Sequence, residues 1–112
     1  MGNLQHFHLP SGTSVSILEF YAVHPWRGDR FSLGKIKTGE MKGRLFIRYS
    51  SDCGTPNSGG MDMLLPEEVS SREFVTVGYL ASLFNANDGR NLYNAEHRIC
   101  LTGDDLTWMD TD

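Results

Sequence analysis

The segment Arg44–Tyr49 constrains the fold more than any other part of this 112-residue chain. Its side chains alternate with the period of two that a β-strand imposes, because successive residues of a strand point to opposite faces of a sheet. One face would carry Leu45, Ile47 and Tyr49, and the other would carry Arg44, Phe46 and Arg48. This segment therefore predicts a strand.

Six other segments have the composition of strands or of the turn between two strands. They are Phe7–Pro10, Ser14–Val23, Phe31–Lys37, the hairpin connection Thr38–Gly43 and, further along the chain, His97–Thr102 and Leu106–Met109. Gly34 lowers the strand tendency of the segment that contains it, because a glycine has no side chain to pack. Most of the regular structure is therefore expected to be extended.

We expect the main helix at about residues 70–85. Apolar residues recur there at three- and four-residue steps, which places them in one stripe of a helix. The stripe consists of Phe74, Val77, Leu80 or Ala81, and Phe84. Ser70 and Glu73 have the spacing of a capping box, and the run that ends at Gly89 suits a helix terminus. Against the helix stand the β-forming residues Val75 and Thr76.

Together these elements predict an α+β fold, with a mostly antiparallel sheet of about five or six short strands and one main helix. The length suits a single domain over residues 1–112, and twelve aromatic residues argue against disorder. No apolar run approaches the roughly twenty residues of a membrane-spanning helix, and the N-terminus lacks an export signal. We therefore expect a cytoplasmic protein with no membrane partner, in which Cys53 and Cys100 are reduced.

Charge is divided unequally between the two halves of the sequence. Residues 1–50 carry seven Lys or Arg and three acids, a net charge of +4, whereas residues 51–112 carry three Arg and eleven acids, a net charge of −8. The two values sum to the −4 of the whole chain. This asymmetry predicts either a charged partner or two halves that neutralise each other within one fold.

The acidic end of the chain gives the leading functional hypothesis. Exposed tryptophan and tyrosine side chains are enriched at the centres of protein interfaces, and surrounding acids attract a basic partner. The candidate protein-binding residues are Tyr93, Asp104, Asp105, Trp108 and Asp110. They favour a non-enzymatic module, such as a small inhibitor, immunity protein or phage-type regulatory protein, that occludes a basic surface of a partner such as a nuclease. The alternative is a last strand whose Leu106 and Trp108 enter the core.

The basic end of the chain gives the second hypothesis, a nucleic-acid-binding module. A strand that presents Phe46 between two arginines offers a ring for base stacking beside phosphate-binding cations. The candidate residues are Lys35, Lys37, Arg44, Phe46 and Arg48. The alternative is that Phe46 packs into a sheet covered on both sides while the arginines pair with the acidic half. Both hypotheses require that the two charged regions remain on separate surfaces.

Metal and catalytic sites are weakly indicated. His6 and His8 would share one face of a strand, and His97 and Cys100 could complete a metal site only if the fold brought them together. Cys53 lies beside an acid that disfavours the thiolate, so we do not expect it to be a nucleophile. No motif for a nucleotide, a dinucleotide or a catalytic triad occurs. We therefore expect no enzymatic activity, no metal and no cofactor.

Overall fold

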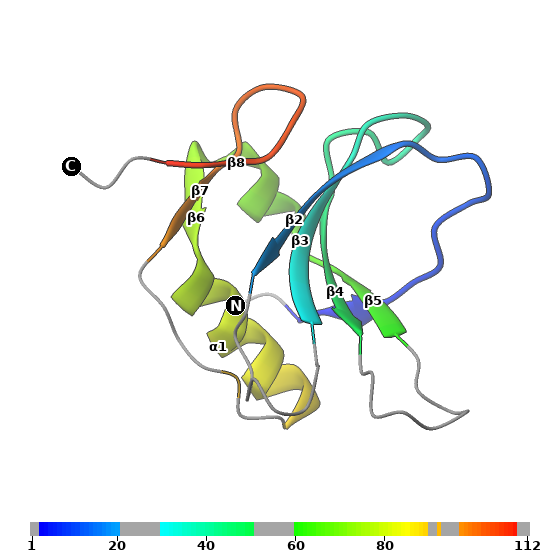
Figure 1. The fold of residues 1–112 in the computed structure, drawn as a ribbon. Helices are drawn as coiled ribbons and strands as arrows, with labels where there is room; N and C mark the ends of the chain where they lie inside the picture. The colour runs from blue at the N-terminus through cyan, green and yellow to red at the C-terminus, as the bar shows by residue number, and fades with distance from the viewer. Residues whose placement is uncertain (1–2, 21–29, 51–59, 90–91, 93–96, 110–112) are drawn as a thin grey trace.

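The computed structural model describes residues 3–20, 30–50, 60–89, 92 and 97–109 (Figure 1). These residues form eight strands, one α-helix and a 3₁₀ helix. In chain order the elements are β1 (Gln5–His6), β2 (Val15–Phe20), β3 (Arg30–Ile36), β4 (Leu45–Ser50), β5 (Gly60–Leu64), the 3₁₀ helix Glu67–Ser71, β6 (Phe74–Thr76), α1 (Val77–Asp88), β7 (Arg98–Cys100) and β8 (Thr107–Trp108).

The larger of two sheets has the strand order β1-β5-β4-β3-β2, and all its neighbouring strands are antiparallel. Strands β2, β3 and β4 are neighbours in both sequence and space. The turn between β3 and β4 contains Gly39 and Gly43, whose φ values of 88° and 90° favour glycine. The predicted hairpin connection at Thr38–Gly43 is thereby confirmed.

The smaller sheet has the order β6-β7-β8 and is also antiparallel. Strand β6 continues directly into α1, and a loop formed by residues 101–106 leads from β7 to β8 (Figure 1). The structure confirms the predicted α+β class with antiparallel pairing and one main helix, and it divides the strands between two sheets.

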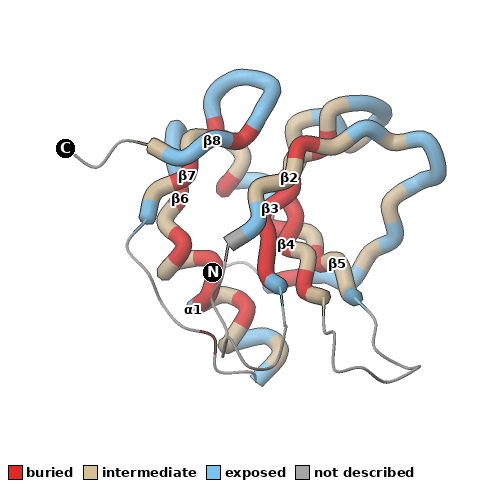
Figure 2. Tube along the Cα trace, viewed as in Figure 1, coloured by how far each residue is buried: buried red, intermediate tan, exposed pale blue. Residues whose placement is uncertain are grey.

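The core lies between the larger sheet, α1 and the smaller sheet. Phe84 of α1 occupies its centre, with its ring centroid 5.3 Å from that of Phe31 in an edge contact and 5.2 Å from that of Tyr49 in a stacked contact. Val75 and Ile99 of the smaller sheet belong to the same cluster. Figure 2 shows buried residues along β3, β4 and the side of α1 that faces them.

The predicted start of the helix at about residue 70 is wrong. Residues 67–71 form a 3₁₀ helix, and the β-forming Val75 and Thr76 belong to β6. The N-cap of α1 is Thr76, whose side-chain oxygen accepts a hydrogen bond of 3.1 Å from the backbone N–H of Tyr79. Ser70 and Glu73 therefore form no capping box. The helix ends where the sequence indicates, at Gly89 with φ 73°.

The other strand boundaries shift by a few residues. The first strand is Gln5–His6 instead of Phe7–Pro10, and β2 begins at Val15. Residues 21–23 of the second predicted strand lie outside the described residues. α1 has 12 residues, and the described part of the chain contains no helix with the length and apolar character that a membrane crossing requires.

Candidate functional site

Two large hydrophobic side chains of the described residues remain exposed, and both belong to the smaller sheet. Trp108 of β8 is 44% exposed and Phe74 of β6 is 37% exposed. The strand register pairs Phe74 with Cys100 and Trp108 with Ile99. Because directly paired residues share a face and neighbours along a strand alternate, the two rings lie on opposite faces of this sheet. They therefore form two separate surfaces.

The Trp108 ring is held at the edge of the sheet. Strand β8 pairs with β7 and is the last strand of its sheet. The His97 ring lies 5.8 Å from the Trp108 ring, centroid to centroid, in an edge-to-face contact. Such contacts orient aromatic rings without burying them completely. The result is an exposed indole that packs against the His97 ring.

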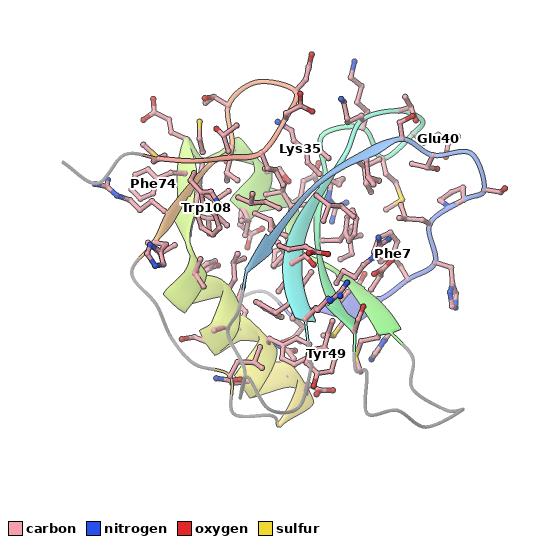
Figure 3. The ribbon with its side chains drawn as sticks, viewed as in Figure 1. Phe7, Lys35, Glu40, Tyr49, Phe74 and Trp108 are labelled. Atoms are coloured by element: carbon pink, nitrogen blue, oxygen red, sulfur yellow. The ribbon has the colours of Figure 1, made fainter. Side chains whose placement is uncertain are left out.

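Phe74 lies under a cation on the outer face. The Arg98 guanidinium is 5.1 Å from the centroid of the Phe74 ring, within the range of a cation–π contact. Figure 3 shows Phe74 pointing away from the rest of the molecule. The helical spacing in the sequence placed Phe74 in the apolar stripe of a predicted helix and therefore did not indicate an exposed ring, although the adjacent Val75 and Thr76 indicated a strand.

The acidic loop between β7 and β8 is attached to the basic end of β3. Lys35 Nζ donates hydrogen bonds to the carbonyl oxygens of Leu101, at 2.8 Å, and Gly103. Lys37 Nζ forms an ion pair with Asp105 at 3.0 Å. The Asp105 side chain is nevertheless 70% exposed, so this pair contributes at most about 1 kcal/mol. Asp104 is also exposed.

Arg48 forms an ion pair across two neighbouring strands. Its Nε and Nη2 atoms donate to the two carboxylate oxygens of Asp62 at 2.9 and 3.1 Å, and β4 and β5 place these residues opposite each other. The hydrogen bond and the charge of Asp62 raise the pKa of Arg48 despite its partial burial. Arg44 Nη2 donates to the carbonyl oxygen of Leu65 at 2.9 Å.

The prediction that Phe46 presents its ring for stacking is wrong. The residue is fully buried on the face of the larger sheet opposite α1. Its ring covers Gly34, where a Cβ atom would lie 2.1 Å from Phe46 Cζ. Phe7, in the N-terminal segment, packs against Phe46 in an edge contact, and the centroids of the two rings are 5.6 Å apart. The ring therefore belongs to the interior of a sheet that is covered on both faces.

The requirement for separate charged surfaces is met only in part. Lys37 and Arg48 form ion pairs with acids of the second half. Lys35 and Arg44 donate to backbone carbonyl oxygens, which carry no net charge. The structure thus favours partial internal neutralisation, the other possibility that the charge asymmetry predicted.

The remaining sequence candidates are placed as follows. Asp104, Asp105 and Trp108 are exposed in or next to the loop 101–106, whereas Tyr93, Asp110 and Cys53 lie outside the described residues. Leu106 is buried, and its N–H donates to Ser16 Oγ of β2 at 2.9 Å. The alternative in which Leu106 and Trp108 both enter the core is therefore correct only for Leu106.

The candidate metal ligands do not converge. His6 and His8 line an open cavity of about 630 Å³ together with Arg48 and Asp62. His97 contacts Trp108, whereas Cys100 Sγ lies 3.1 Å from Thr102 Oγ1. Within residues 3–20, 30–50, 60–89, 92 and 97–109, no three His, Cys, Asp or Glu side chains are arranged to hold a metal ion.

Comparisons with protein-family models, with curated proteins and with solved structures found no match.

Proposed function

We propose that this chain is a non-enzymatic protein-binding module whose contact surface is centred on Trp108 and the loop 101–106. The proposed partner is a protein with a basic surface, such as a nuclease, which the module would occlude. In this proposal the chain acts in the cytoplasm as a small inhibitor, immunity protein or phage-type regulatory protein.

The exposure of Trp108 is the observation that carries the proposal. An indole that is 44% exposed on an edge strand offers a large apolar area to a partner. Tryptophan is enriched among the few interface residues that supply most of the binding free energy. Contact with His97 orients the ring before binding, which lowers the entropy lost on association. The ring is therefore suited to act as an anchor.

The exposed carboxylates beside this strand supply a second, weaker contribution. Asp104 and Asp105 would attract a basic surface and accelerate encounter. Because Lys37 partly cancels the charge of Asp105, we expect modest electrostatic acceleration. The non-enzymatic part of the proposal rests on the sequence, which contains no motif for a nucleophile–base pair or for cofactor binding.

Nucleic-acid binding through β4 is no longer favoured. Phe46 is buried, and Arg44 and Arg48 already donate to groups of the same chain. Base stacking on Phe46 would require the protein to uncover this ring first.

Affinity capture from a nuclease-treated extract of the native host tests the proposal. The wild-type chain should retain a basic protein that Trp108→Ala loses, whereas Glu40→Ala should retain it. Glu40 is exposed in the turn between β3 and β4, on the other side of the molecule from Trp108 (Figure 3). Equal retention of that protein by the wild-type chain and by Trp108→Ala would contradict the proposal. Capture of nucleic acid without any protein from an extract that was not treated with nuclease would also contradict it.

A further inference from the structure

We propose that a cavity at the end of β3 binds a compact phosphate-type anion. This lysine pocket has a volume of about 630 Å³ and opens to solvent. Its polar lining consists of Ser14, Lys35, Lys37, Thr38, Lys42 and Asp104, and Ile36 and Gly43 complete the lining. The inference does not depend on the proposed protein contact.

Three lysines line this cavity, and they differ in the partners of their ammonium groups. Lys35 Nζ donates to two backbone carbonyls, which are uncharged acceptors. Lys37 is paired with Asp105, but both side chains are accessible to water, so an incoming anion can compete for the ammonium. Lys42 is exposed and makes no side-chain hydrogen bond or ion pair with the described residues. The pocket therefore carries positive charge that contacts within the described residues do not fully neutralise.

A hydroxyl donor lies among the lysines. Thr38 Oγ1 accepts a hydrogen bond of 3.0 Å from the backbone N–H of Ser14. A hydroxyl that accepts one bond can still donate its proton, so Thr38 can donate to a ligand oxygen. The nearby backbone N–H groups of Lys37, Lys42 and Gly43 are already bonded to carbonyl oxygens of the chain. Side chains must therefore make the contacts with the anion.

This set of donors fits phosphate chemistry. Lysine binds phosphate oxygens as a point charge, and a group with several oxygens can contact several ammonium groups at once. Asp104 also lines the pocket and repels an anion, so it limits the affinity. Glu40 belongs to the same turn but lines the neighbouring cavity beside Met41. The opposed effects of Lys42 and Asp104 provide the test.

Isothermal titration calorimetry with pyrophosphate at low ionic strength measures the binding. We expect saturable binding to the wild-type chain, a loss of about three- to tenfold in affinity for Lys42→Ala, and retention for Lys42→Arg. Asp104→Asn should raise the affinity, because it removes a repelling charge. Arg30→Ala is the matched control, because it removes an exposed cation from the other end of β3.

Two results would overturn the inference. One is the absence of saturable binding to the wild-type chain at low ionic strength. The other is an equal loss for Arg30→Ala and Lys42→Ala, which would show diffuse attraction to positive charge in place of a site. Chemical-shift changes at Thr38 and Gly43 on addition of pyrophosphate would locate the bound anion, and shifts confined to other parts of the chain would contradict the assignment.

Discussion

Gly34 and Phe46 illustrate what can and cannot be predicted at the scale of single residues. The period of two in Arg44–Tyr49 places Phe46 on the face opposite Leu45, and the structure confirms this alternation. It does not indicate what covers that face. Phe46 packs on Gly34 of the adjacent strand and against Phe7, which is thirty-nine positions away in the chain. Gly34, which lowers strand tendency locally, is therefore the residue that makes room for the ring.

Gly34→Ala should destabilise the protein strongly. The added Cβ would lie 2.1 Å from Phe46 Cζ, so the buried ring or the two strands must move. We expect a loss of about 1–3 kcal/mol in the free energy of unfolding, measured by urea denaturation. In the background of Phe46→Leu the same substitution should cost less, since a smaller side chain leaves room for the methyl group. Equal costs in the two backgrounds would show that the ring does not set the constraint.

Cys100 should ionise at a lower pH than an ordinary cysteine. The hydrogen bond with the Thr102 hydroxyl, whose oxygen lies 3.1 Å from the sulfur, is the main cause that lowers the pKa of the Cys100 thiol, and the positive charge of Lys35 adds a smaller effect. A lowered pKa means that the thiolate persists at pH values where an unperturbed thiol is protonated. In a Cys53→Ser background, the rate of alkylation by iodoacetamide should therefore rise at a lower pH than for a model thiol. Thr102→Val should move this midpoint upward, and an unchanged midpoint would contradict the assigned cause.

At the scale of elements, helical periodicity in the sequence predicts the buried residues of α1 correctly but does not predict where β6 ends and α1 begins. Val77, Leu80, Ala81 and Phe84 are buried at helical spacing, as the sequence predicts. Phe74 continues that spacing by coincidence, but it is exposed on a strand. Pairing of β6 with β7 decides the local structure here, and partners 22 to 26 residues away in the chain leave no local periodic signal. The β-forming Val75 and Thr76 were the available indication.

Thr76→Ala should destabilise α1, whereas Ser70→Ala should not. Thr76 caps the first turn of the helix, and removal of such a cap costs about 1 kcal/mol. Ser70 is the residue that the sequence suggests as a cap, yet its Oγ atom is buried without a hydrogen-bond partner. Because an unsatisfied buried hydroxyl is unfavourable, Ser70→Ala should leave the free energy of unfolding unchanged or raise it. Thermal or urea unfolding followed by circular dichroism gives both values, and the reverse order would contradict the assigned helix start.

At the scale of the whole molecule, the sequence gives the charge of each half but not the pairing. The basic end of β3 holds the acidic loop 101–106 through Lys35 and Lys37, and Arg48 is paired with Asp62. These contacts join residues that the antiparallel topology and the docking of the two sheets bring together. Trp108 remains exposed at the edge of the smaller sheet, and Asp104 remains exposed in the preceding loop. The amino-acid composition of the two halves does not indicate which basic residue contacts which acidic residue or carbonyl group.

The kinetics of binding to the captured partner test the central claim, which is that Trp108 anchors a protein contact and the acidic loop assists encounter. Association and dissociation rate constants should be measured by surface plasmon resonance at low and high ionic strength. Trp108→Ala should accelerate dissociation about thirtyfold, as expected for loss of about 2 kcal/mol at an anchor residue. The pair of substitutions Asp104→Asn and Asp105→Asn should slow association at low ionic strength and change dissociation little. Unchanged dissociation of Trp108→Ala would contradict the account.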